Sequence, residues 1–91
     1  MKYIMGIDPG KSGGIAFLPL DDRDAIPEAY SMKKLTEADI LEVMMLHQAQ
    51  MCYIEKVHSM PGQGVASSFT FGQNYGFLRG LLIGRGIPFE K

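Results

Sequence analysis

Two short apolar runs in this sequence end in a carboxylate, and these two acids are the residues whose type and spacing could do chemistry. Tyr3–Ile7 is followed by Asp8, and Tyr53-Ile54 is followed by Glu55. Two carboxylates held close together repel each other unless one is protonated or a cation lies between them. Oxygen-only ligands select hard ions such as Mg²⁺ or Mn²⁺, which can orient a water for in-line attack on a phosphodiester. Asp8 and Glu55 are therefore candidate metal ligands and catalytic residues.

A structural explanation of the same two acids stays open at this point. A carboxylate that closes a buried strand is costly unless it is paired, hydrogen-bonded or bound to a cation. Asp8 could cap the Pro9-Gly10 turn, and Glu55 could pair with Lys56 or Lys11. Residue spacing alone does not separate these roles from metal binding.

The elements around Asp8 are predicted to form an antiparallel meander. Tyr3–Ile7 has no helical period and is typical of a strand buried on both faces. The glycine-rich turn after Asp8 leads into a second strand, Ile15–Leu18. Pro27 precedes a third strand, Glu28–Met32, which we expect at the edge of the sheet because proline is tolerated there.

A helical crossover is predicted to bring Glu55 next to Asp8. Thr36 can cap a helix with Asp39 in a partial capping box, and His47 lies near the end of that helix, where a positive charge is favourable. A helix between strands allows Met51–Val57 to run parallel to Tyr3–Ile7. Sites in open sheets form beyond the carboxyl ends of the strands, where both acids would then lie.

The last third of the sequence predicts a second helix with a regular glycine row. Ser67 or Ser68 can cap this helix, which we expect to run to about Ile83, and residues 86–89 begin a fifth strand. The glycines at steps of four are Gly72, Gly76, Gly80 and Gly84. Tight packing on the sheet is the favoured explanation, ahead of helix-to-helix dimerisation or close approach to a phosphate backbone. The neighbouring apolar stripe is expected in the core and consists of Phe71, Tyr75, Leu78 and Leu82.

Composition sets the outer limits on function. The 91 residues make one domain at most, and 46% hydrophobic with 21% charged residues is typical of a globular chain. The lone cysteine, Cys52, excludes a disulfide framework, is expected to be a small buried hydrophobe, and favours a reducing, cytoplasmic location. No run approaches the length of a membrane span. A net charge of -1 argues mildly against strong non-specific nucleic-acid binding.

Three segments together resemble the RuvC-like Holliday-junction resolvases of the ribonuclease H-like superfamily, especially the short phage and prophage forms. These segments are GIDPGKSGGIAF, YIEKVHSMPGQG and GQNYGFLRGLL. The resemblance implies an α/β fold whose mixed sheet has a three-strand antiparallel meander followed by parallel strands, with two helices. It also implies a metal-dependent endonuclease of four-way DNA junctions that uses Mg²⁺ or Mn²⁺, with Asp8 and Glu55 as the first two metal ligands.

The resemblance also guides the search for DNA contacts and partners. Lys11, Lys56, His58 and Arg79 are candidate phosphate or base contacts, whereas Gln73 and Asn74 are assigned no contact. Resolvases complete their site with acids on a C-terminal helix that this sequence lacks. We therefore expect residues 1–91 to be a single truncated nuclease domain, incomplete or inactive, that forms a homodimer or higher oligomer.

Two other functions are compatible with the same residues. The first is a catalytically dead module for junction binding or dimerisation. The second is a fragment of an actin-like or sugar-kinase ATPase, since such proteins open with a segment similar to GIDPG. The short chain and the absence of a second phosphate loop argue against the ATPase.

Overall fold

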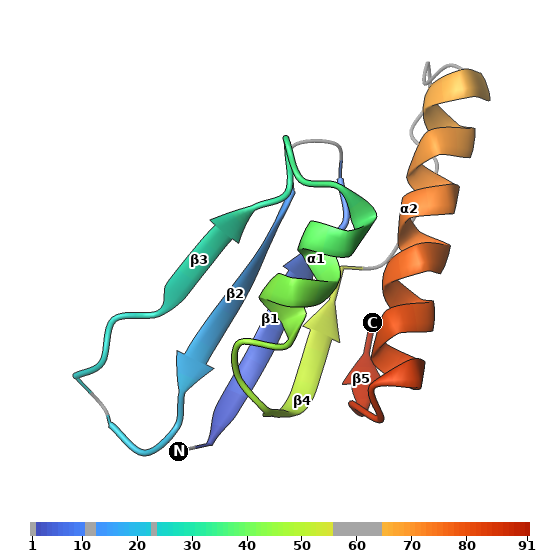
Figure 1. The fold of residues 1–91 in the computed structure, drawn as a ribbon. Helices are drawn as coiled ribbons and strands as arrows, with labels where there is room; N and C mark the ends of the chain where they lie inside the picture. Colours follow the sequence, from blue (N-terminus) through green and yellow to red (C-terminus); the bar gives the residue numbers. More distant parts are fainter. Residues whose placement is uncertain (1, 11–12, 23, 56–64) are drawn as a thin grey trace.

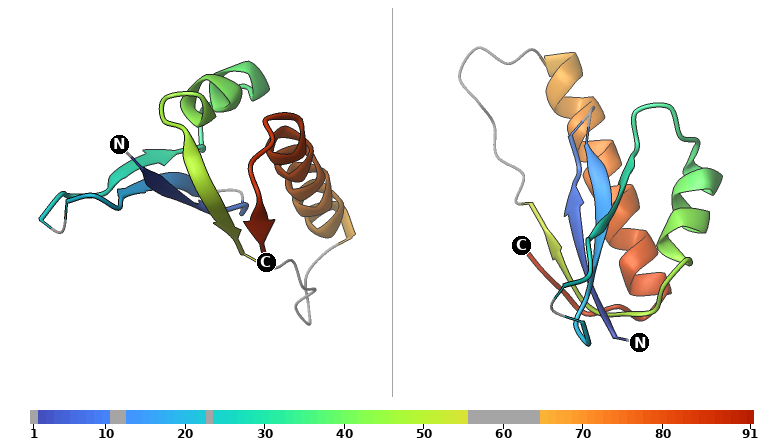
Figure 2. Two further views of the ribbon diagram at one scale, coloured as in Figure 1. Left: turned by 90° about the horizontal axis from the view of Figure 1, so that it is seen from below. Right: turned by 90° about the vertical axis from the view of Figure 1, so that its left-hand side faces the viewer.

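The chain folds into one mixed sheet with both helices packed on the same face (Figures 1 and 2). This computed structural model describes residues 2–10, 13–22, 24–55 and 65–91. The elements are β1 (Tyr3–Asp8), β2 (Gly14–Pro19), β3 (Glu28–Ser31), α1 (Glu37–Met44), β4 (Ala49–Ile54), α2 (Val65–Gly84) and β5 (Phe89–Glu90). The strand order is β3-β2-β1-β4-β5, so β1, the strand that carries Asp8, is central.

The strand pairing confirms the predicted meander and crossover. β1 pairs antiparallel with β2, β2 pairs antiparallel with β3, and β3 lies at the edge that Pro27 predicted. β4 returns parallel to β1 after α1, and β5 adds a further parallel strand beside β4. β5 is shorter than expected, because Gly86 turns the chain with a φ of 71° before the strand begins at Phe89.

The start of α1 is the capping box that the sequence predicts. The Thr36 hydroxyl accepts a hydrogen bond from the Asp39 amide at 3.1 Å, and the Asp39 carboxylate accepts one from the Thr36 amide at 3.0 Å. The helix buries Ile40 and Met44 against the sheet. The two reciprocal hydrogen bonds satisfy backbone amides that have no partner within the helix, and they thereby stabilise the start of α1.

The hydrophobic core lies between the sheet and the two helices. Alternate residues of the three central strands are buried there, among them Phe17 and Cys52 with no exposed surface. Leu78 and Leu82 of α2 are buried against them, as the apolar stripe predicted. Burial raises the pKa of the Cys52 thiol to about 12, which keeps the thiol protonated and inert, as a structural cysteine should be.

The opposite face of the sheet is open, which corrects the expectation that the Tyr3–Ile7 strand is buried on both faces. Tyr53 of β4 is 51% exposed and Leu18 of β2 is 43% exposed, and neither is covered by a helix. The apolar runs of β1 and β4 are continuous in sequence because they also place apolar residues, Ile4 and Met51, on this open face, where both are half-buried. Burial is therefore one-sided in the described residues.

α2 begins earlier and faces differently from the prediction. It starts at Val65, so that Ser67 and Ser68 lie within the helix and not before its first residue. The glycine row does not pack on the sheet. A Cβ added at Gly72, Gly76, Gly80 or Gly84 would meet no atom within 4 Å. The row therefore forms the outer face of the helix. No helix in the described parts of the chain has the length and apolarity needed to cross a membrane.

His47, in the connection between α1 and β4, contacts Glu28 of the edge strand β3. Its Nε2 lies 2.6 Å from Oε2 of Glu28, and its ring stacks on Tyr3 with centroids 4.0 Å apart. The Tyr30 hydroxyl donates to the same Glu28 oxygen at 3.2 Å. The expected role of His47 as an end charge of α1 is therefore wrong, because the helix ends at Met44 and the imidazole pairs with β3.

This contact predicts an acid-sensitive contribution to stability. The hydrogen bond from His47 holds the pKa of the Glu28 carboxyl below its ordinary value of 4.5. A carboxyl with a depressed pKa stabilises the fold above its unfolded-state pKa, and that contribution is lost as the pH falls through the folded-state value. We expect urea denaturation from pH 7 to pH 3 to show less loss of stability for Glu28→Gln than for the parent. Glu42→Gln, on the exposed side of α1, is the control; identical pH profiles for Glu28→Gln and parent would contradict the prediction.

Candidate metal-binding site

The strand register places Asp8 and Glu55 at neighbouring positions where two parallel strands end. Ile7 and Ile54 are paired across β1 and β4, and the Glu55 amide donates to the Ile7 carbonyl at 3.0 Å. The next residues are Asp8, which ends β1, and Glu55, which directly follows β4. Paired residues of parallel strands lie on the same face, with the strands about 4.8 Å apart. Because Ile7 and Ile54 are buried under the helices, the two acids emerge together on the open face, and both are exposed.

Asp8 also caps the turn that follows it, and this structural role leaves one carboxylate oxygen for a metal ion. The Gly10 amide donates to Oδ1 of Asp8 at 3.0 Å. This bond occupies one carboxylate oxygen and fixes the side-chain rotamer, as in other Asx turns. The second oxygen accepts no hydrogen bond from the described residues. The suggested partners of Glu55, Lys11 and Lys56, lie outside the described residues.

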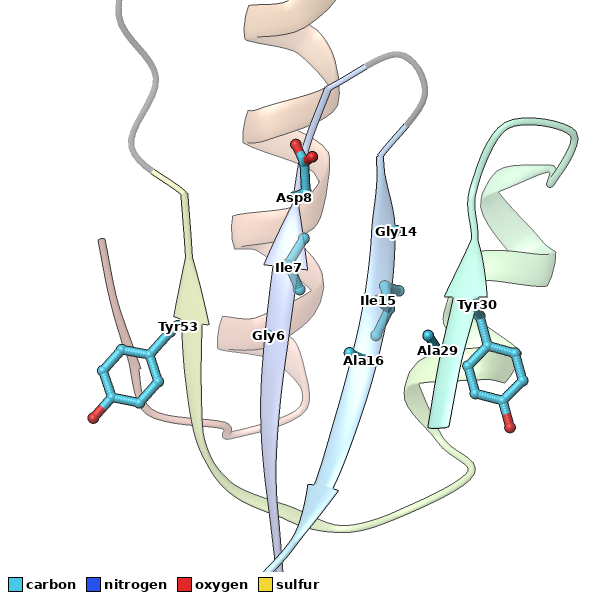
Figure 3. Close-up of a pocket in the computed structure, with 9 residues that line it drawn as sticks. All are labelled: Gly6, Ile7, Asp8, Gly14, Ile15, Ala16, Ala29, Tyr30 and Tyr53. Atoms are coloured by element: carbon cyan, nitrogen blue, oxygen red, sulfur yellow. The ribbon is translucent and has the colours of Figure 1, made fainter. Parts of the chain in front are cut away.

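A shallow open groove of about 440 Å³ runs across the sheet beside Asp8 (Figure 3). Its floor is a row of small residues in register, Ala29, Ala16 and Gly6, which continues to Tyr53 on β4. Figure 3 shows Asp8 above this row, at the end of β1, with Tyr53 on the neighbouring strand β4. The small side chains leave room for a bulky ligand to approach the carboxylate from the open face.

Asp8 and Glu55 have the type of oxygen donor that a magnesium ion prefers. Mg²⁺ is commonly held by one or two carboxylates, with water and substrate phosphates as the remaining ligands. Asp8 and Glu55 supply two hard oxygen donors in an exposed position that water and a phosphate can reach. No group of three or more candidate ligand side chains occurs within residues 2–10, 13–22, 24–55 and 65–91. An ion held by Asp8 and Glu55 would therefore take its remaining ligands from water and substrate.

The predicted DNA contacts fall into two groups. Lys11, Lys56 and His58 lie outside the described residues. Arg79 is half-buried on α2, with its guanidinium carbon 5.8 Å from the centroid of the Tyr75 ring. Lys91, which the sequence did not single out, places its Nζ 6.0 Å from the same ring. Arg79 and Lys91 thus each lie near the Tyr75 ring, and a phosphate contact by Arg79 stays a prediction.

Asn74 is the residue near the candidate site that the sequence analysis did not assign. Its side-chain nitrogen donates to the carbonyl of Pro9, the residue after Asp8, at 2.6 Å. The sequence contained an indication of this contact, because Asn74 lies four residues before the buried Leu78 and therefore on the sheet side of α2. A polar side chain on such a face must find a partner.

The strand order and the two helices of this chain have the same fold as solved structures of RuvC. Two of the similar solved structures are of RuvC from Thermus thermophilus. The structure of that RuvC with a Holliday junction substrate superposes with a TM-score of 0.69 at 16% identity, over 98% of this chain and 62% of RuvC. A second Thermus thermophilus RuvC structure has a TM-score of 0.63 at 16% identity, over 96% of this chain and 61% of RuvC.

These similarities show the fold. The chain spans about three fifths of the length of the RuvC chains that it matches. No family model matches the sequence, and no curated protein matches it. The predicted sheet of antiparallel and parallel strands with two helices is confirmed.

Proposed function

We propose that this chain acts on branched DNA as the metal-binding part of a structure-selective endonuclease. The observation that carries the proposal is the neighbouring placement of Asp8 and Glu55 at the carboxyl ends of β1 and β4 in a RuvC-like fold. A similar structure, RuvC of Thermus thermophilus, was determined with a Holliday junction substrate, which suggests a four-way junction as the substrate here. The free, buried Cys52 suits a cytoplasmic setting.

Each carboxylate has a defined part in this proposal. Asp8, whose Oδ1 is held by the Gly10 amide, offers its other oxygen as a ligand, and Glu55 offers a second carboxylate from the adjacent strand. Mg²⁺ or Mn²⁺ bound there would lower the pKa of a water and stabilise the charge on a leaving oxygen. The groove beside Asp8 gives the phosphodiester backbone access from the open face of the sheet.

A second candidate is a junction-binding module without catalytic activity. It is favoured by the two-carboxylate donor set, since two-metal hydrolysis needs more ligands than the described residues bring together. In this case the chain binds junctions in a salt-sensitive manner, and that binding survives loss of both acids.

A four-way junction and a linear duplex of the same sequence separate these functions. Each DNA is mixed with the parent chain or with an Asp8→Asn/Glu55→Gln double variant, in Mg²⁺, Mn²⁺ or a chelator. The endonuclease proposal predicts tighter binding to the junction and divalent-dependent cleavage that the double variant lacks. Junction binding without cleavage, equal in both proteins, would favour the inactive module. Equal affinity for junction and duplex, or binding of Mg²⁺–ATP with no binding of DNA, would contradict both.

We further propose that α2 pairs with α2 of a second copy. The outer face of the helix carries the glycine row and no charged residue, and it is bounded by Phe69 and Ile83, which are 65% and 64% exposed. These two side chains are about four helical turns apart, with Gly76 midway between them. An antiparallel two-fold arrangement would place Phe69 against the partner's Ile83, while Gly76 lets the two backbones approach closely.

Replacement of Gly76 by a larger residue is expected to dissociate this dimer. Gly76→Gln puts a long side chain where the two helices cross, and in the isolated chain it should slightly stabilise α2 because glycine is a poor helix former. Light scattering after size exclusion should give a dimer for the parent and a monomer for Gly76→Gln. Leu46→Gln, which removes an exposed apolar residue elsewhere, should leave the dimer intact. A monomeric parent at micromolar concentration would refute the α2 interface.

A further inference from the structure

The hydrogen bond between Asn74 and Pro9 joins two parts of the chain that are far apart in sequence. The donor is Nδ2 of Asn74 on α2, and the acceptor is the Pro9 carbonyl in the turn after β1, 2.6 Å away. A carbonyl oxygen only accepts hydrogen bonds, so the contact fixes which way the Asn74 amide points. The bond is partly buried, and α2 therefore holds the residue that directly follows Asp8.

The turn itself provides only part of the restraint on Asp8. The Gly10 amide binds Oδ1 of Asp8, and the Gly13 amide binds the Gly10 carbonyl at 2.9 Å. Neither bond involves Pro9, which lies between Asp8 and Gly10 and has no N–H of its own. Without Asn74, the Pro9 carbonyl would lose its partner at a partly buried position, and a shift of the turn towards water would relieve that cost.

A shift of this kind would move the candidate metal ligand. The Asp8 side chain and the Gly10 amide are joined by a hydrogen bond, so rotation of the Pro9 peptide changes the direction of the carboxylate. Glu55 is held separately by the ladder between β4 and β1. The relative placement of the two acids thus depends on the contact from α2.

We infer that Asn74 is a positioning residue, which orients the Asp8 carboxylate towards Glu55 by holding the Pro9 carbonyl. The inference rests on the proposed metal site for its functional consequence. In this role α2 both packs on the hydrophobic core and holds the turn that carries Asp8. Asn74 does not touch the substrate or the metal in this scheme.

The test uses Asn74→Ala, Asn74→Gln and the neighbouring control Gln73→Ala. Alanine removes the donor while favouring the helix, glutamine retains an amide donor, and Gln73 lies on the exposed side of α2. In the metal-free protein, NMR hydrogen exchange of the Gly10 amide should be about tenfold faster in Asn74→Ala, because the Asx turn loosens. It should stay close to the parent rate in Gln73→Ala and be partly restored in Asn74→Gln.

Titration with Mn²⁺, followed by electron paramagnetic resonance, gives the second measurement. Loss of an outer partner of a metal ligand typically weakens affinity by about 10–100-fold, and we expect this for Asn74→Ala, with recovery in Asn74→Gln. Unchanged Gly10 exchange and unchanged Mn²⁺ affinity in a folded Asn74→Ala would overturn the inference. Faster Gly10 exchange in Asn74→Ala supports the positioning role even if the parent binds no Mn²⁺. Failure of the parent to bind Mn²⁺ would contradict only the proposed metal site.

Discussion

Asp8→Asn is expected to weaken Mn²⁺ binding by about 100-fold or more while leaving the fold intact. The asparagine oxygen can still accept the hydrogen bond from the Gly10 amide, so the turn after β1 is preserved. The negative charge is lost, however, and with it a hard anionic ligand. Loss of a ligand should cost at least the roughly 10–100-fold that loss of a supporting partner costs.

The same substitution should not lower the stability of the metal-free protein. Asp8 and Glu55 are like charges on adjacent strand ends, and removal of one relieves their repulsion. We therefore expect the thermal midpoint of Asp8→Asn to equal or exceed that of the parent without metal, and addition of Mn²⁺ to raise only the parent's midpoint. Glu42→Gln, on the exposed side of α1, is the charge-matched control. A parent and an Asp8→Asn variant with equal Mn²⁺ affinity would remove Asp8 from the site.

Gly13→Ala is expected to destabilise the protein by about 2–4 kcal/mol, because the turn after β1 has no space for a side chain. A Cβ at Gly13 would lie 1.9 Å from the carbonyl oxygen of Asp8 and 2.8 Å from that of Gly10. Both obstacles are backbone atoms, which cannot move aside as a flexible side chain can. The Gly13 carbonyl also accepts from the Met32 amide, so displacement of this residue would disturb the end of β3 as well.

Gly6→Ala provides the matched control for this prediction. A Cβ at Gly6 meets nothing within 4 Å, since the residue faces the open side of the sheet. Alanine costs less backbone entropy than glycine, so this variant should be neutral or more stable by about 0.5–1 kcal/mol. Urea denaturation measures both variants. Equal stability of Gly13→Ala and Gly6→Ala would mean that the turn can adopt a different conformation at little cost.

The sequence predicted the parts of the fold that depend on local chemistry. The meander follows from apolar runs separated by glycine and proline turns, and the start of α1 follows from Thr36 and Asp39. The parallel return of β4 follows from a helix between two strands. Because both apolar runs end in an acid, the same pattern predicts that Asp8 and Glu55 lie at neighbouring strand ends.

Other features could not be predicted because they depend on which surfaces meet. Glycine is compatible with either tight packing or open space, so the row through Gly76 does not reveal its own orientation. Continuous apolar runs suit one-sided as well as two-sided burial when the open face carries half-buried residues such as Ile4. The pairing of His47 with Glu28 depends on how the connection after α1 lies over the edge strand.

Local sequence thus accounts for the strands, their order in the chain and the acids at their ends, because turn residues, caps and apolar periodicity act over a few neighbouring positions. The contact of Asn74 with Pro9 and the outward glycine face of α2 arise only when that helix docks on the sheet. Docking is set by packing between segments distant along the chain, and no short pattern of residues encodes it.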